Sequence, residues 1–155
     1  MIKDFVKRIL GKFNIEVNNK YIFETSDDPI EIIRRIFSTK GVNTIIDGGA
    51  SIGDISLKFA NYFPKSNVYC FEPYSEFNQL LSQRFEDNER ISIYPFALNS
   101  TNVPLDLYVN KSKGTNSTLP PASNGVSIYG TQFENTGLER TKGISLDSWA
   151  KQNSI

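Results

Sequence analysis

The stretch NTIIDGGASIGDIS, from Asn43 to Ser56, decides the fold of this chain. An apolar run ends in Asp47, and three glycines and two small residues follow within the next six positions. A second acid, Asp54, then opens a segment with helical spacing. A buried strand, a flexible turn and a helix N-terminus together are typical of a turn that binds an anion or a nucleotide, because free N–H groups and the helix dipole point at the ligand. Glycine lets that ligand approach the backbone closely.

The next apolar run, NVYCF, is followed by an acid that suits a ribose. Glu72 comes 25 positions after Asp47, which is the spacing of one strand–helix–strand unit. An acid at the end of the next parallel strand commonly accepts hydrogen bonds from ribose hydroxyls. Pro73 fixes the chain just after Glu72. We therefore predict that Asp47 and Glu72 serve one nucleoside ligand.

Asp47 also indicates which nucleoside this is. Gly48, Ala50 and Gly53 match a G-x-A-x-x-G dinucleotide pattern only weakly, because an acid closes the strand where a glycine is needed. A carboxylate that faces the ligand repels a diphosphate and attracts a cation. S-adenosylmethionine carries a sulfonium and an ammonium and no phosphate, so Asp47 favours this cofactor over NAD. A Walker A loop is excluded, because no Gly-Lys-Ser/Thr follows.

From Asn43 onward, buried apolar runs alternate with segments of helical spacing. This alternation predicts an α/β fold with a parallel sheet and helices on both faces. The predicted strands are NTIID, NVYCF and ISIYPFAL, and the predicted helix stripes are Ile52, Ile55, Phe59 and Phe63, then Phe77, Leu81 and Phe85. Beyond Asn99 we expect a half-exposed strand at VPLDLYVN, a polar loop at KSKGTNSTLPPASNG, and a last strand at TKGISLDSWAKQ with Asp147 capping a helical turn.

Residues 1–41 are predicted to form an N-terminal arm of helical and extended segments, separate from a domain at residues 42–155. Apolar residues at helical spacing within residues 1–13, flanked by Lys and Arg, indicate a docked helix or, alternatively, a helix lying on a membrane surface. IEVNNKYIFE fits a hairpin or an extended arm. A helix then begins with Asp28 as cap, Pro29 first and Glu31 completing a capping box, and Gly41 can end it.

Composition excludes several classes of function. The chain has 17 basic and 17 acidic residues, which argues against a general nucleic-acid-binding surface and leaves only a local basic patch as an alternative, so we predict no nucleic-acid partner. It has no histidine, which excludes Ser-His-Asp and Cys-His catalysis and most zinc sites, and one cysteine, which excludes an intrachain disulfide. We predict no metal site, although carboxylates without EF-hand spacing could still hold calcium or magnesium. No apolar run approaches a membrane span and the start is too charged for a signal peptide, so we expect a cytoplasmic protein.

The segments VNTIIDGGASIGDISLKFA, VYCFEP, ISIYPFALNS and ISLDSW resemble the FkbM-type S-adenosylmethionine-dependent methyltransferases, in order and spacing, over Val42 to Trp149. The first family motif usually reads D-x-G-A-N-x-G-D, and Ser51 stands here where Asn is usual. The resemblance implies a Rossmann-like class I methyltransferase fold. It places the methionine part of the cofactor against Asp47, Gly49, Ala50, Ser51 and Gly53. It places the ribose at Glu72, and the adenine near Phe96, Ala97 and Leu98, for which plain strand core is the alternative.

The resemblance implies O-methylation of a small-molecule, sugar or glycan hydroxyl. In the family, a strand with a Lys/Asp-rich motif follows LDSW, whereas this chain stops at Ile155, so the catalytic residues stay unknown. The alternative is a truncated or degenerate module that binds cofactor or a partner without catalysis.

The stop also predicts a sheet that is incomplete at its C-terminal side. We expect the strand Thr44–Asp47 to lack one neighbour, so that the chain belongs to a longer protein or self-associates through the open edge. Alternatively, VPLDLYVN or GISLDSW folds back and pairs with that edge.

Overall fold

The computed structural model of this chain describes residues 15–18, 21–24, 29–37, 41–122 and 124–155. The chain divides into two compact units, Met1–Gly41 and Val42–Ile155. The helix predicted within residues 1–13 and the Asp28 cap lie outside the described residues. Within the described part, no helix is both long enough and apolar enough to cross a lipid bilayer.

Among its described residues, the first unit contains a hairpin and one helix. Strands β1 (Ile15–Asn18) and β2 (Tyr21–Glu24) pair antiparallel, which confirms the hairpin over the extended arm. Helix α2 (Pro29–Phe37) begins at the predicted proline. In its first turn, Glu31 accepts a hydrogen bond from Arg34 Nε at 2.9 Å.

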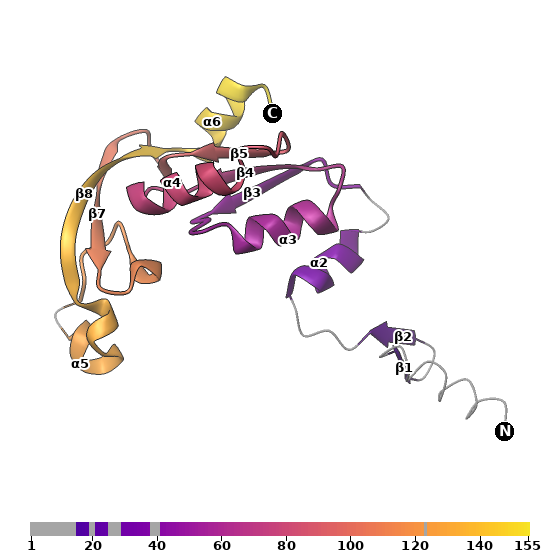
Figure 1. Cartoon of the computed structure of the whole chain (residues 1–155), viewed down its shortest axis with the longest axis horizontal. Coiled ribbons are helices and arrows are strands. Elements are labelled where there is room, and N and C mark those ends of the chain that lie inside the picture. The colour runs from indigo at the N-terminus through magenta and orange to yellow at the C-terminus, as the bar shows by residue number, and fades with distance from the viewer. Residues whose placement is uncertain (1–14, 19–20, 25–28, 38–40, 123) are drawn as a thin grey trace. The chain divides into compact units, whose positions relative to one another are not determined.

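The second unit is built on a parallel sheet, as predicted. Strands β3 (Thr44–Gly48), β4 (Asn67–Phe71) and β5 (Ile91–Tyr94) lie in the order β3-β4-β5, and both pairs are parallel. Helices α3 (Asp54–Tyr62) and α4 (Ser75–Arg84) form the two crossovers (Figure 1). This connectivity brings the ends of β3 and β4, and the turns that follow them, to one edge of the sheet.

Helices cover both faces of this sheet. Successive strand residues point to opposite sides, and β4 carries buried apolar residues on each side. On one face, Val68 and Cys70 are fully buried together with Ala60 of α3 and Leu81 of α4. On the other face, Phe71 packs against Trp149 of α6 (Leu146–Asn153), with ring centroids 5.1 Å apart. Figure 1 shows α6 on the side of the sheet opposite α3.

The predicted single strand ISIYPFAL is wrong, because the chain leaves the first sheet at Pro95. Proline has no N–H to donate to a strand ladder, and β6 (Phe96–Leu98) begins a second sheet directly after it. This second sheet has the order β6-β8-β7. Strand β8 (Asn135–Ile144) pairs parallel with β6 and antiparallel with β7 (Pro104–Asn110), which is the strand predicted at VPLDLYVN.

The two segments that could have covered the β3 edge both contribute to the second sheet instead. VPLDLYVN forms β7, which pairs with β8, and GISLDSW begins with the last two residues of β8, which pair with β6. Among the described residues, β3 pairs with β4 alone. The fold-back alternative is wrong, since β7 pairs with β8 in the second sheet, where Figure 1 shows the two strands as separate ribbons that curve side by side.

Short helical turns lie between β7 and β8. The 3-10 turn η1 (Lys113–Thr115) lies within the predicted polar loop, and α5 (Gly125–Tyr129) and η2 (Thr131–Phe133) precede β8.

The predicted cap of the last helix is wrong by two residues. Ser145 caps α6 by accepting from Ser148 N, while Asp147 lies in the first turn.

The predicted apolar stripe of α3 is wrong at its start. Ile52 and Ile55 are 41% and 45% exposed, whereas Ser56 and Ala60 are buried. These two small side chains let α3 approach the sheet closely, and Cys70 Sγ donates to Ser56 Oγ at 3.1 Å. Close approach, rather than the bulk of the apolar residues, sets the buried face of this helix.

Gly53 is the residue that fits α3 against α4. Its φ of +86° lies in the left-handed region, and a Cβ there would come within 2.5 Å of the Phe85 ring and 2.7 Å of Leu81 Cδ2. Both the backbone conformation and the space therefore require glycine.

We expect Gly53→Ala to lower the free energy of unfolding by about 2–4 kcal/mol, through left-handed strain and overpacking. Urea denaturation measures this difference. Gly137→Ala is the matched control, because its Cβ would lie 3.9 Å from Val109 Cβ, an ordinary contact. Equal stability of the two variants would contradict this account of Gly53.

Candidate functional site

The glycine turn after β3 is held against the end of β4 by backbone hydrogen bonds. Gly49 N and Ala50 N both donate to the Phe71 carbonyl, at 2.8 Å and 3.1 Å. Gly49 and Ser51 have φ values of +81° and +52°, in the left-handed region. Asn adopts this region more readily than Ser, so Ser51 holds a backbone conformation that is uncommon for its residue type.

Glu72 joins this turn to the chain that leaves β4. Its Oε2 atom accepts from Ser51 N at 2.8 Å, and its Oε1 atom accepts from Tyr74 N at 2.9 Å. The residue is only 6% exposed. The carboxylate that sequence reasoning assigns to a ribose is therefore buried directly beside the glycine turn.

Burial raises the pKa of Glu72 above its usual 4.5, because the charged form loses water. The backbone hydrogen bonds from Tyr74 and Ser51 act in the opposite direction, and the nearby negative charge of Asp47 raises the pKa further. Desolvation is the largest of these effects.

Asp47, the other predicted acid, begins a hydrogen-bonded chain into the core. Its Oδ2 atom accepts from Ser56 Oγ at 2.5 Å, and that oxygen in turn accepts from the Cys70 thiol. Loss of water and the charge of Asp47 together raise the pKa of Cys70 to about 11, although the bond to Ser56 lowers it. The buried cysteine predicted from the sequence is thus an unionised core thiol.

A cleft of about 130 Å³ opens beside the turn, and three predicted residues line it: Gly49, Ser51 and Glu72. A Cβ on Gly49 would meet no protein atom within 4 Å, so that residue borders open space. Pockets that bury most of a drug-sized ligand usually measure roughly 300–1,000 Å³. This cleft therefore holds only part of a nucleoside in the conformation described.

The opposite wall of the cleft comes from the second sheet and was missed by sequence reasoning. Phe77 and Leu107 add apolar surface, and Lys113, Gly114 and Asn116 add the turn η1 and its end. Asn116 Oδ1 accepts from Asn110 N at 2.9 Å, while its buried Nδ2 donates to no atom of the described residues. The sequence shows this segment as a polar loop and carries no signal that it faces Glu72.

The other predicted cofactor-binding residues do not line this cleft. Ala50 is buried in the core and Gly53 lies under α4. Ala97 is buried on β6, where it pairs with Gly143 of β8. Roles for Asp47, Ala50, Gly53 and Ala97 in cofactor binding stay predictions.

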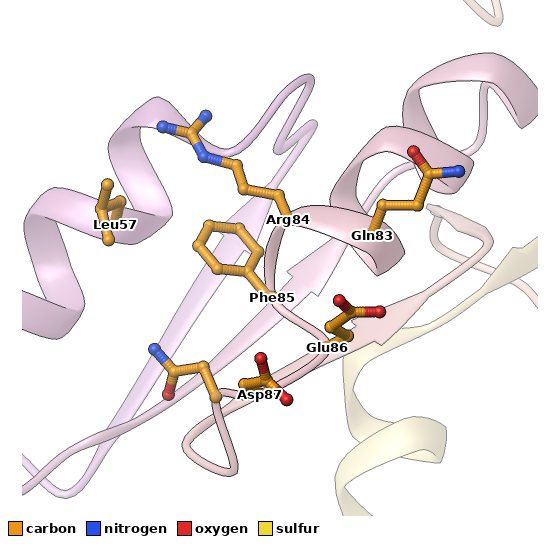
Figure 2. Close-up of a pocket in the computed structure, with 7 residues that line it drawn as sticks. Leu57, Gln83, Arg84, Phe85, Glu86 and Asp87 are labelled. Atoms are coloured by element: carbon orange, nitrogen blue, oxygen red, sulfur yellow. The ribbon is translucent and has the colours of Figure 1, made fainter.

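A larger depression, of about 350 Å³, lies at the end of α4, and none of the residues predicted to bind the cofactor lines it. Figure 2 shows the Arg84 side chain extending over the Phe85 ring toward α3. Arg84 is already bound to Asp54 Oδ1 at 2.7 Å and to the Ile52 carbonyl at 2.5 Å. Its guanidinium thus links the end of α4 to the start of α3.

In the described part of the chain, no three His, Cys, Asp or Glu side chains gather where they could hold a metal ion.

Comparison with known proteins adds little to this geometry. No protein-family model and no curated protein matches the sequence. Among solved structures, a Staphylococcus aureus protein assigned as a caffeoyl-CoA O-methyltransferase matches with a TM-score of 0.39 and 15% identity, over 59% of this chain and 42% of that one.

Two Pyrococcus horikoshii structures match with a TM-score of 0.32 each. One is assigned as a transferase, with 20% identity over 57% of this chain and 43% of that one. The other is TYW2 in complex with MeSAdo, with 17% identity over 64% and 56%. This chain spans about half of the length of the three structures. Every one of these three TM-scores is below 0.5, so we infer function from the site itself.

The raised pKa of Glu72 predicts how stability changes with pH. The folded state favours the protonated acid, so the contribution of Glu72 to the free energy of unfolding is full below pH 4.5 and is lost as the pH rises through the raised pKa. From about pH 4 to about pH 7, we expect the stability difference between parent and Glu72→Gln to shift in favour of the variant. Urea denaturation across this range measures it. A shift in favour of the parent would show that the two backbone hydrogen bonds outweigh desolvation.

The environment of Cys70 predicts a thiol that reagents cannot reach in the native state. It is fully buried, and a pKa of about 11 leaves about one thiol in a thousand ionised at pH 8. We expect alkylation by iodoacetamide to be at least a hundredfold slower in buffer than in urea, as followed by mass spectrometry. Because the chain has one cysteine, one adduct reports the site. Equal rates would show that the α3–β4 contact opens freely.

Proposed function

We propose that the Val42–Ile155 unit binds S-adenosylmethionine at the cleft and forms the cofactor-binding part of an O-methyltransferase that resembles the FkbM type. One observation carries this proposal. Ser51 N donates to Glu72 Oε2 at 2.8 Å, so the turn after β3 and the acid after β4 border one cleft. Ligands of open parallel sheets bind beyond the carboxyl ends of the strands.

Glu72 can accept ribose hydroxyls in addition to its backbone donors. An ionised carboxylate has about four acceptor positions, and two N–H groups use one position on each oxygen here. Gly49 leaves space beside the same carboxylate, where a side chain would otherwise stand. These features fit a nucleoside with two neighbouring hydroxyls.

Asp47 favours a cationic ligand over a phosphorylated one. It lies at the end of β3, half-buried, where it adds negative charge beside Glu72. When bound, S-adenosylmethionine supplies a methyl group already activated by its positive sulfur. The residues of this chain would bind and orient that cofactor, and no base is assigned among them.

The acceptor is proposed to be a hydroxyl of a sugar, a glycan precursor or another small molecule, methylated in the cytoplasm. The second candidate is a module that binds cofactor weakly or holds a partner, without catalysis. The small volume of the cleft, about 130 Å³, favours this second candidate. Turnover of a sugar acceptor by a preparation that binds the cofactor separates the two.

The first test is calorimetric titration with S-adenosylhomocysteine. We expect Glu72→Gln to weaken binding by about 1–3 kcal/mol, because a charged acceptor is replaced by a neutral amide. Glu86→Gln is the matched control, since it changes an exposed acid that does not line the cleft. No heat with the parent chain would remove the proposed function. Equal affinities for parent and Glu72→Gln would remove the ribose role of Glu72.

A further inference from the structure

The glycine turn after β3 offers little to an anionic group. Backbone N–H groups bind an anion best where they lack an acceptor within the chain. Four of the five N–H groups over residues 49–53 already have one, and they belong to Gly49, Ala50, Ser51 and Gly53. The fifth belongs to Ile52, which does not line the cleft at Glu72. The negative charges of Asp47 and Glu72 further disfavour an anion beside this turn.

The opposite wall of the cleft carries a cation. Lys113 of η1 is half-buried, and it is the one cation among the described residues that line the cleft. Its Nζ atom lies 5.7 Å from the centroid of the Tyr74 ring and donates to Thr136 Oγ1 at 3.5 Å. A ring face attracts an ammonium, and a hydroxyl accepts from it, but both groups are neutral. The charge of Lys113 is therefore held in place without being neutralised.

The acids near Tyr74 do not neutralise Lys113 either. Among the described residues, no carboxylate forms an ion pair with this side chain. Glu76 accepts from the Tyr74 hydroxyl at 2.6 Å. Glu139 accepts from the N and Oγ atoms of Ser75, at 3.3 Å and 3.1 Å. In the described part of the chain, Lys113 thus brings an unbalanced positive charge to a cleft whose other wall is negative.

We propose that Lys113 binds the carboxylate at the amino-acid end of the cofactor and so determines which nucleosides the cleft accepts. This role rests on the proposed function, because it assigns a residue to one group of the same ligand. Glu72 would then serve the ribose and Lys113 the carboxylate, from opposite walls of one cleft. Gly49 lies between them in the lining, where a Cβ would meet no protein atom within 4 Å.

The charges of the two walls select a zwitterion. S-adenosylmethionine carries a carboxylate, an ammonium and a sulfonium. Asp47 and Glu72 attract the two cationic groups, whereas Lys113 attracts the carboxylate. The lysine ammonium has three donors to offer such an anion. A phosphate fits less well, because its second negative charge would face Glu72 across a cleft of about 130 Å³.

Two probes isolate this contact: S-adenosylhomocysteine and its decarboxylated form, which keeps the adenine, the ribose, the thioether and the ammonium. Each is titrated calorimetrically into the 155-residue chain. We expect the parent chain to bind S-adenosylhomocysteine about tenfold more tightly than the decarboxylated probe, the lower end for a hydrogen bond to a charged group. Lys113→Gln should remove this difference without weakening the decarboxylated probe. Lys113→Arg, which keeps the charge, should preserve it.

Lys111→Gln is the matched control. It removes the same charge two residues earlier, from a side chain that is 60% exposed, pairs with Glu134 and does not line the cleft. We expect this variant to bind both probes as the parent does.

The outcomes separate the role of Lys113 from the proposed function. If Lys113→Gln weakens both probes equally, or weakens neither, the role of Lys113 is overturned while cofactor binding stands. If Lys113→Gln does not fold, equal affinities of the parent chain for the two probes overturn it. If the parent chain binds neither probe, the proposed function fails and the role of Lys113 fails with it.

Discussion

The carboxylate of Glu72 is the constraint on which this end of the parallel sheet depends. It is buried, and both of its oxygens accept backbone N–H groups, from Ser51 before it and Tyr74 after it. These bonds stabilise a turn whose φ values would otherwise be unfavourable for Ser51. The same bonds offset part of the desolvation that raises the pKa of the acid. Under the proposed function, ligand binding and local folding would depend on this one side chain, so a substitution there would affect both.

The second sheet and the turn η1 supply one wall of the cleft at Glu72, and the first sheet supplies the other. Strand β8 pairs with β6 and β7 together, and β6 follows β5 after one proline. This arrangement carries the segment after β7 to the cleft, where Lys113 and Asn116 face the glycine turn. An acidic side and a donor-rich side then border one cleft. Such a pair of walls suits a ligand that carries both hydroxyl donors and an anionic or carbonyl acceptor.

Local patterns predicted the first sheet, whereas pairing between distant segments could not be predicted. The runs NTIID and NVYCF, with the spacing of Asp47 and Glu72, predicted β3, β4 and the contact between the turn after β3 and Glu72. Helical periodicity failed for Ile52 and Ile55, because the packing of Ser56 against Cys70 decides which face of α3 is buried. The η1 wall was missed because the β7–β8 register is a tertiary property, set by contacts across some 30 residues of sequence.

Gly53 carries a consequence for how sequences of this kind can diverge. The side chains of Leu81 and Phe85 occupy the space that a Cβ at position 53 would need. Any residue with a Cβ at this position would need smaller partners at both positions on the neighbouring helix, and a different backbone angle as well. Three coordinated changes are rarer than one. Among homologous sequences, glycine at position 53 should therefore persist even in members that have lost the acid at position 72, so its presence reports packing rather than an active site.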